Sequence, residues 1–148
     1  MISLFRKREV EIWDGSYMYD EHPVYSRDYE VPFAIIFSRN FFGNITGKVH
    51  DDVSKGGMKD EGKIKGNISK GGIRFIKRMP KFEGRDDLGN PLQLNIPHPL
   101  LHYNGTYNQS QNQYEGIWEI DPAIFHIKGR GSFKTGKSRG RWKMRRRN

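Results

Sequence analysis

The chain has 148 residues, of which 34% are hydrophobic and 29% are charged, and its formal net charge is +9. This length fits one domain with a core of its own, spanning residues 1–148. The chain has no cysteine, which excludes disulfides and thiolate metal sites. No apolar run approaches the ~20 residues of a membrane helix, so we expect a cytoplasmic protein without a membrane span.

Glycine alternates with apolar residues along much of the chain. The pattern begins at 43–49 and 62–68 and returns at 105–107, 116–118 and 129–133. A period of two is the spacing of a β-strand, in which every second side chain shares a face. Glycine on the apolar face of a strand marks strong coiling or close approach of backbones. Its recurrence on strand after strand predicts a sheet that curls tightly enough to close into a small barrel.

The alternation predicts nine strands in chain order, joined by several short turns. Glycine-bearing turns at 69–72 and 135–140 indicate hairpins, and no stretch has a helical period. We therefore expect an all-β fold, a single antiparallel up-and-down barrel of eight to nine strands with little helix. The last two strands would form a basic C-terminal hairpin at 125–147 within this barrel. The predicted strands are 10–19, 32–38, 41–50, 61–69, 73–79, 100–108, 113–121, 125–134 and 140–147.

One connection, between Pro80 and Pro99, is long and contains four of the seven prolines. Long loops in compact domains often act as lids or binding loops. A surface loop tethered to the barrel is the simpler interpretation, and the sequence slightly favours it.

Several short motifs share the rhythm of a known superfamily. They resemble calycin-type barrels, which include lipocalins, fatty-acid-binding proteins and avidins. The resemblance implies a barrel that holds a small ligand inside, and it implies no particular site. Lipocalins place a glycine two residues before their first-strand tryptophan, whereas here Gly15 follows Trp13. The motifs are Trp13-Asp-Gly-Ser-Tyr, Phe42-Gly-Asn-Ile-Thr-Gly, Gly62-Lys-Ile-Lys-Gly, Tyr103-Asn-Gly-Thr-Tyr, Tyr114-Glu-Gly-Ile-Trp and Gly140-Arg-Trp-Lys-Met.

Five aromatic residues of the late strands fall on the face that the alternation turns inward. They are Tyr103, Tyr107, Tyr114, Trp118 and Trp142. Aromatic rings with polar atoms, next to glycine, can line an amphipathic cavity. A barrel of about eight strands is either just filled by its side chains or holds one small ligand, so both interpretations remain open. Our first hypothesis is non-catalytic binding of a small amphipathic or hydrophobic ligand by these five residues.

The positive charge is concentrated at the end of the chain. No acidic residue follows Asp121, but ten basic residues do. If 125–134 pairs with 140–147, the outward side chains form one basic stripe. The stripe could bind a polyanion such as nucleic acid or an anionic surface, weakly and without sequence preference. A solvated stripe, paired in part with Glu115, Glu119 and Asp121, is the interpretation that we favour. Its residues are Lys128, Arg130, Lys134, Arg141, Lys143, Arg145 and Arg147.

Metal and catalytic motifs are weak throughout the chain. The five histidines are scattered, and neighbours such as His50 and Asp51 point in opposite directions on a strand, so we expect no metal site and no cofactor. No serine lies in a nucleophile elbow. An isomerase- or cyclase-like enzyme that uses the barrel interior is a third hypothesis, for which the sequence nominates no catalytic residue.

Overall fold

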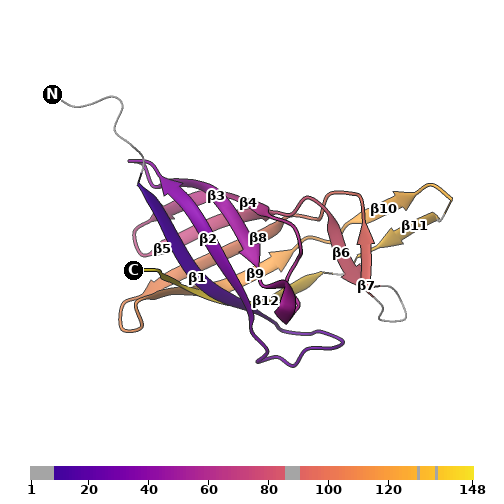
Figure 1. Cartoon of the computed structure of the whole chain (residues 1–148), viewed down its shortest axis with the longest axis horizontal. Coiled ribbons are helices and arrows are strands. Elements are labelled where there is room, and N and C mark those ends of the chain that lie inside the picture. Colours follow the sequence, from indigo (N-terminus) through magenta and orange to yellow (C-terminus); the bar gives the residue numbers. More distant parts are fainter. Residues whose placement is uncertain (1–8, 86–90, 130, 136) are drawn as a thin grey trace.

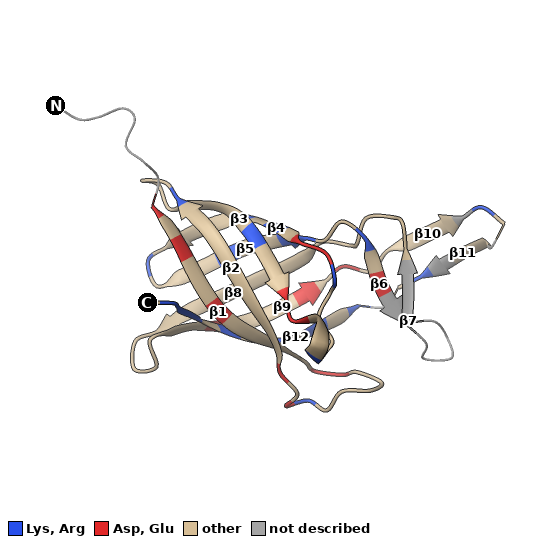
Figure 2. Ribbon diagram, viewed as in Figure 1, with Lys and Arg blue, Asp and Glu red and all other residues tan. Residues whose placement is uncertain are grey.

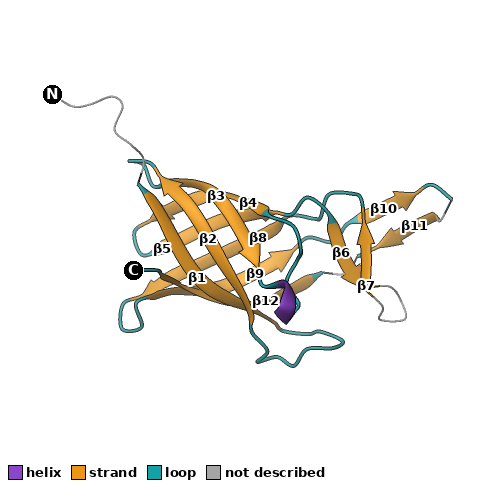
Figure 3. Ribbon diagram, viewed as in Figure 1, coloured by secondary structure: helices purple, strands orange, loops and turns teal. Residues whose placement is uncertain are grey.

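The computed structural model describes residues 9–85, 91–129, 131–135 and 137–148. Eight antiparallel strands close into an up-and-down barrel in the order β1-β12-β9-β8-β5-β4-β3-β2, as predicted (Figures 1 and 3). The described residues contain no α-helix, only the short 3-10 turn η1 (Val53–Lys55), and thus no helix long and apolar enough to cross a membrane. The barrel strands are β1 (Val10–Tyr19), β2 (Val31–Arg39), β3 (Asn44–Asp51), β4 (Gly62–Ser69), β5 (Gly72–Arg78), β8 (Leu101–Asn108), β9 (Gln113–Ile120) and β12 (Ser138–Arg146).

Two hairpins are inserted into this meander. β6 (Phe82–Arg85) and β7 (Pro91–Leu94) lie between β5 and β8, within the long connection at 80–99. β10 (Ile124–Ile127) and β11 (Gly131–Lys134) lie between β9 and β12 and pair with each other. Both hairpins project from the same side of the barrel (Figure 1).

The expected pairing of 125–134 with 140–147 is wrong. Gly129 and Gly131 both adopt a φ of +82° and turn this segment back on itself, so that it forms a separate hairpin. β12 instead pairs with β9 on one side and with β1 on the other, which closes the barrel. The region 125–147 is therefore not one hairpin of the barrel.

The two ends of the barrel differ in their connections. At one end, which we call the turn end, the short turns at 40–43, 70–71 and 109–112 join the strands. At the other end, the loop end, lie the β1–β2 loop (20–30), the β3–β4 connection (52–61) and both inserted hairpins (Figure 1).

Inward glycines explain how so many aromatic rings fit inside. Each of five inward strand glycines is paired across the sheet with a large aromatic residue, and at Gly15 and Gly140 the partner's ring lies 2.6 and 2.7 Å from where a Cβ would be. A Cβ on Gly47, for example, would lie 2.7 Å from the Cβ of its partner. The pairs are Gly15 with Phe33, Gly47 with Phe37, Gly66 with Phe75, Gly116 with Trp142 and Gly140 with Trp118.

The motif Gly-x-Trp occurs on β9 and again on β12, and the two copies pair reciprocally. Trp118 lies opposite Gly140, and Trp142 lies opposite Gly116. Each ring crosses its glycine and reaches the strand beyond. The indole nitrogen of Trp118 donates to the carbonyl of Met18 at 3.1 Å, and that of Trp142 donates to the carbonyls of Asn104 and Ile117 at 3.2 and 3.0 Å. This reciprocal pair fixes the register of β12.

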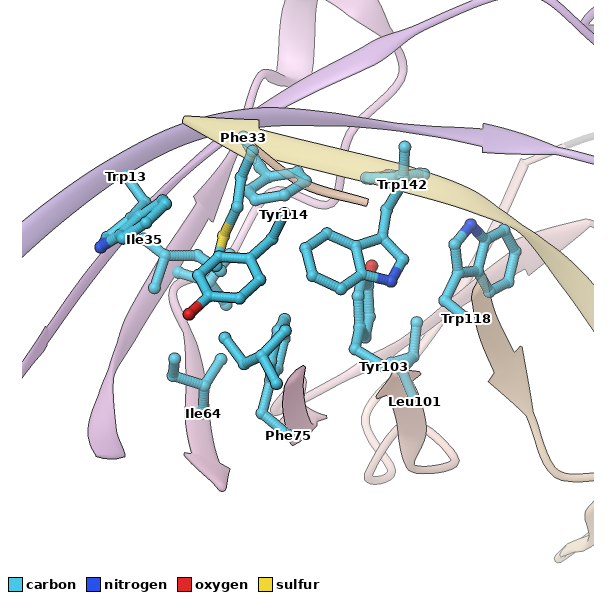
Figure 4. Close-up of a cluster of buried hydrophobic side chains, with 14 of the residues drawn as sticks. Trp13, Phe33, Ile35, Ile64, Phe75, Leu101, Tyr103, Tyr114, Trp118 and Trp142 are labelled. Carbon is cyan, nitrogen blue, oxygen red and sulfur yellow. The ribbon is translucent and has the colours of Figure 1, made fainter. Parts of the chain in front are cut away.

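The core is a column of aromatic rings along the barrel axis (Figure 4). Trp13, Phe37 and Tyr114 pack near the turn end, and Phe75, Tyr103 and Trp142 pack in the middle. Tyr17, Tyr19 and Trp118 pack toward the loop end. Burial of side chains of this size stabilises the fold by roughly 1.5–3 kcal/mol each.

Candidate functional site

A buried ion pair lies inside the barrel at the loop end. Lys77 of β5 and Asp51 of β3 are turned inward by the same alternation that buries Phe75 and Val49. The ammonium nitrogen of Lys77 lies 2.8 and 3.0 Å from the two carboxylate oxygens of Asp51. The two side chains are 2% and 0% exposed. A charge pair sealed this completely is expensive to desolvate, so its presence requires either compensating hydrogen bonds or a function.

Tyrosine hydroxyl groups extend this pair into a polar cluster. The hydroxyl of Tyr17 donates to Asp51 Oδ2 at 3.3 Å, and the ammonium group of Lys77 lies 5.1 Å from the centre of the Tyr17 ring. The ring of Tyr19 contacts the ring of Tyr17 edge to face, with centroids 5.7 Å apart. We call Tyr17, Tyr19, Asp51, Lys77 and the adjoining Tyr103 the polar cluster.

Burial keeps two of these hydroxyl groups protonated. It raises the pKa of Tyr17 well above its ordinary value, and the negative charge of Asp51 raises this pKa further. The pKa of Tyr103 is raised well above the ordinary value by the same two causes, burial first. Both tyrosines are therefore hydrogen-bond donors at neutral pH, and with Lys77 they concentrate donors at one end of the barrel.

A row of aromatic rings continues from Tyr19 at the end of β1 into the β1–β2 loop. Tyr19, His22, Tyr25 and Tyr29 follow one another with centroids 4.6, 4.5 and 4.4 Å apart. The hydroxyl of Tyr29 donates to the carbonyl of Lys55 at 2.8 Å, which ties the loop to the β3–β4 connection. Beside the row is an open hollow of about 570 Å³, lined by Asp20, Glu21, His22, Pro23 and Tyr25.

The described part of the 80–99 connection is tied to the barrel end. His98 is buried, its ring stacks on Phe82 with centroids 5.6 Å apart, and its Nδ1 lies 2.7 Å from the carbonyl of Pro99. Burial lowers the pKa of His98. Phe82 also packs on Phe125 of the other hairpin at 5.1 Å. Residues 86–90 of this connection lie outside the described residues.

The five aromatic residues expected to bind a ligand are distributed along the barrel interior (Figure 4). Tyr103 belongs to the polar cluster, Trp118 packs on Tyr19 of this cluster, and Trp142 packs on Tyr103 in the middle of the column. Tyr107 and Tyr114 pack on each other near the turn end, remote from the cluster. Four of the five are buried and Tyr107 is half-buried. The structure therefore groups two of them with the polar side chains and three with the packed core.

The predicted basic stripe is divided between two sheets, and three of its residues, Arg141, Lys143 and Arg147, form ion pairs with acids of the protein. Lys128 and Lys134 belong to the β10–β11 hairpin, and Arg130 lies outside the described residues. On β12, whose Lys and Arg positions are blue in Figure 2, most basic side chains contact acids of β1 and the β1–β2 loop. Of the three acids expected as partners, only Glu119 makes such a contact, with Arg139 at 3.9 Å, among the described residues. The β12 ion pairs are Arg139 and Arg141 with Asp20, Arg141 with Asp28, Lys143 with Glu30, Arg146 with Glu11, and Arg147 with Asp14.

A second hollow lies on the outer wall of the barrel, over β4, β5, β8 and β9. Its volume is about 580 Å³, and its polar lining includes Asn67, Arg74, Asn104, Thr106 and Glu115. No group of three or more His, Asp or Glu side chains in the described ranges could hold a metal ion.

Sequence reasoning missed Lys77 and Asp51. The signal was present, because Phe75-x-Lys77 and Val49-x-Asp51 continue the inward parity of their strands. Charged side chains are ordinarily placed outside a barrel, and β3 and β5 are not neighbours in the sheet, so neither strand alone indicates the pair.

Comparison of the chain with family models, with curated proteins and with solved structures gave no match. The eight-stranded closed antiparallel barrel fits a calycin-like fold in general.

Proposed function

We propose that this protein binds one small amphipathic ligand at the loop end of its barrel, without transforming it chemically. The observation that carries the proposal is the polar cluster around Lys77 and Asp51, which lies under the longest connections of the fold. A hydrophobic pair of similar volume would often stabilise a barrel as well or better. The cost of burying these charges is therefore consistent with a role in recognition.

The chemistry of the cluster indicates the class of ligand. Lys77 and the hydroxyl groups of Tyr17 and Tyr103 offer donors to a polar or anionic head group, such as a carboxylate. The rings of Trp118 and Tyr103 offer flat apolar surfaces to an aromatic or aliphatic body. A ligand would enter beside His22 and Tyr25, where the hollow lies, and would displace part of the aromatic row.

Binding without catalysis fits the same geometry better than an enzyme does. The ammonium group of Lys77 lies within hydrogen-bonding distance of both oxygens of Asp51, and a paired ammonium group has no free electron pair for nucleophilic attack. Polyanion binding by β12 is less well supported, because acids of the protein itself already contact most of its basic side chains.

Native mass spectrometry of the purified protein tests the proposal directly, since a co-purified ligand would add a discrete mass. The ligand class is tested by titration with the amphipathic aromatic anion anilinonaphthalene sulfonate, followed by its fluorescence. We expect one molecule bound per chain. The double variant Lys77→Met/Asp51→Leu removes both charges together and should weaken binding about tenfold or more, equivalent to 1.4 kcal/mol.

Two tryptophan variants separate the loop end from the rest of the core. Trp118→Phe should weaken binding of the probe, whereas Trp13→Phe, a matched change near the turn end, should not. Near-ultraviolet circular dichroism controls for loss of the fold. Equal affinities in the wild type and the charge-free double variant would contradict the proposal.

A further inference from the structure

Two adjacent phenylalanines stand in solvent at the turn end of the barrel. Phe41 and Phe42, in the turn between β2 and β3, are 97% and 80% exposed. Their rings contact each other edge to face, with centroids 5.6 Å apart. Single exposed apolar residues are common on protein surfaces, but a pair of large rings at one loop tip indicates an interaction site.

The turn that carries these rings is held firmly by hydrogen bonds. The side-chain oxygen of Asn40 accepts from the amides of Phe42 and Asn44 at 3.0 and 2.9 Å. The neighbouring strand β4 contributes two more bonds: the amide of Ile68 donates to the carbonyl of Gly43 at 2.7 Å, and Asn67 Nδ2 donates to the carbonyl of Phe42 at 3.3 Å. The exposed rings are therefore presented on a fixed platform and not on a slack loop.

Exposed basic residues lie on other parts of the barrel: Lys65 in the middle of β4, Lys70 in the β4–β5 turn and Arg145 near the end of β12. None of the three has an ion-pair partner among the residues that the structure describes. The buried carboxylate of Glu11 at the turn end is already held by Arg39 and Arg146. The barrel that carries the exposed rings thus also carries excess positive charge.

We propose that the turn end docks on an anionic lipid surface. Phe41 and Phe42 would insert at the boundary between head groups and acyl chains, while Lys65, Lys70 and Arg145 would contact acidic head groups. Interfacial binding of this kind scales with buried apolar area plus electrostatic attraction to anionic lipids. A protein partner is less well supported, because protein hot spots occupy the centre of a larger apolar patch, whereas here two rings stand at one loop tip.

This proposal is independent of the proposed function, because it uses the opposite end of the barrel. A molecule docked in this way would hold its loop end and the hollow beside His22 away from the bilayer (Figure 1). Any ligand would then enter from the aqueous side.

Sedimentation with lipid vesicles tests the proposal. We expect the full chain to bind vesicles of phosphatidylcholine mixed with phosphatidylserine, to bind pure phosphatidylcholine much less, and to bind less as salt rises. Phe41→Ser/Phe42→Ser should lower the partition coefficient about tenfold or more, because it removes both inserted rings. Lys65→Gln/Lys70→Gln should weaken only the binding to the anionic vesicles.

A matched control is Ile124→Ser, which removes a 63% exposed apolar side chain from the hairpin at the other end and should leave vesicle binding unchanged. Absence of binding to anionic vesicles, or binding that survives the double phenylalanine variant, would overturn the proposal.

Discussion

At the residue scale, the positions that tolerate least change are the inward glycines. A Cβ on Gly140 would lie 1.8 Å from the carbonyl oxygen of Met18 and 2.7 Å from the ring of Trp118. Neither obstacle can move easily, because the indole nitrogen of Trp118 is bonded to that same carbonyl. Position 140 therefore has room only for glycine, because the ring of Trp118 lies over it.

We predict that Gly140→Ala lowers the free energy of unfolding by about 1–3 kcal/mol or more, the usual cost of overpacking a core. Gly72→Ala is the matched control, since its Cβ would come no closer than 3.5 Å to the carbonyl of Gly105. It should change stability by no more than about 1 kcal/mol. Urea denaturation measures both. Equal losses in the two variants would show that close approach at Gly140 does not decide its cost.

His98 gives the protein a specific sensitivity to mild acid. Burial is the largest effect and lowers the pKa of His98 in the folded state, with a further lowering by the charge of Lys77, against the opposing effects of the hydrogen bond to the Pro99 carbonyl and of the charge of Asp51. As the pH falls below about 6.5, the unfolded chain therefore binds a proton that the folded protein does not. Stability from this group is complete above that pH and is lost as the pH falls through the folded-state pKa.

We predict that His98→Gln loses less stability than the wild type between about pH 7 and pH 5, measured by urea denaturation at each pH. His126→Gln, a change at an exposed histidine on the β10–β11 hairpin, should keep the slope of the wild type. A wild-type slope in His98→Gln would mean that other groups cause the acid sensitivity.

At the scale of elements, β12 is stabilised by the charges that were expected to bind a polyanion. Lys143 lies 2.9 Å from Glu30, and the pair is about half exposed on both sides. The hydrogen bond from Lys143, followed by that from Ser16, lowers the pKa of Glu30. The basic strand is thus matched to the acidic β1–β2 loop.

We predict that Lys143→Glu lowers stability by up to about 1 kcal/mol, because it places two carboxylates together in place of an exposed ion pair. The swapped variant Lys143→Glu/Glu30→Lys should recover part of the loss, and high salt should shrink the difference. Thermal or urea unfolding of the wild type, the two single variants Lys143→Glu and Glu30→Lys, and the swapped variant forms a double-mutant cycle. An additive cycle would show that the two side chains do not interact.

The positions of the barrel strands could be predicted from the sequence, but the pairing of one strand with its neighbours could not. The two-residue period placed the barrel strands to within a few residues, because glycine and aromatic positions alternate cleanly. It assigned β12 the wrong neighbour, since Phe125 and Ile127 alternate as well as Trp142 and Met144 do. The motifs Gly116-x-Trp118 and Gly140-x-Trp142 are consistent with the observed pairing of β12 with β9. Only the strand register of the folded protein shows that each tryptophan lies opposite the glycine of the other motif.

The candidate site was less predictable than the fold for a similar reason. Parity placed the aromatic residues inside, but the polar cluster depends on Asp51 and Lys77 meeting from strands that flank β4. Such contacts skip a strand and have no signature in a single sequence. The exposure of Phe41 and Phe42 was equally hard to predict, because the sequence assigned both residues to a strand at 41–50. In the structure they lie in a turn, and the turn geometry directs their rings into solvent.

At the scale of the whole molecule, the first and last strands lie side by side. Trp13 pairs with Arg146, and the amide of Arg147 donates to the carbonyl of Ile12 at 2.7 Å. We predict that a circular permutant, with Asn148 joined to Met1 and new ends between the exposed Ser110 and Gln111, folds into the same barrel. Near-ultraviolet circular dichroism and a cooperative urea transition are the measurements. Loss of both would show that the β8–β9 turn is needed to form the barrel.

The closing seam between β1 and β12 also determines when the barrel can form during synthesis. Until β12 leaves the ribosome, β1 and β9 have no partner on one side, and both remain open sheet edges. Because the seam joins residues more distant in sequence than any other strand pair, its loop-closure entropy is the largest in the fold and slows folding. A nascent chain that stalls before Ser138 would therefore expose two edges that can pair with other chains, so this protein should depend on chaperones most in the interval before β12 is synthesised.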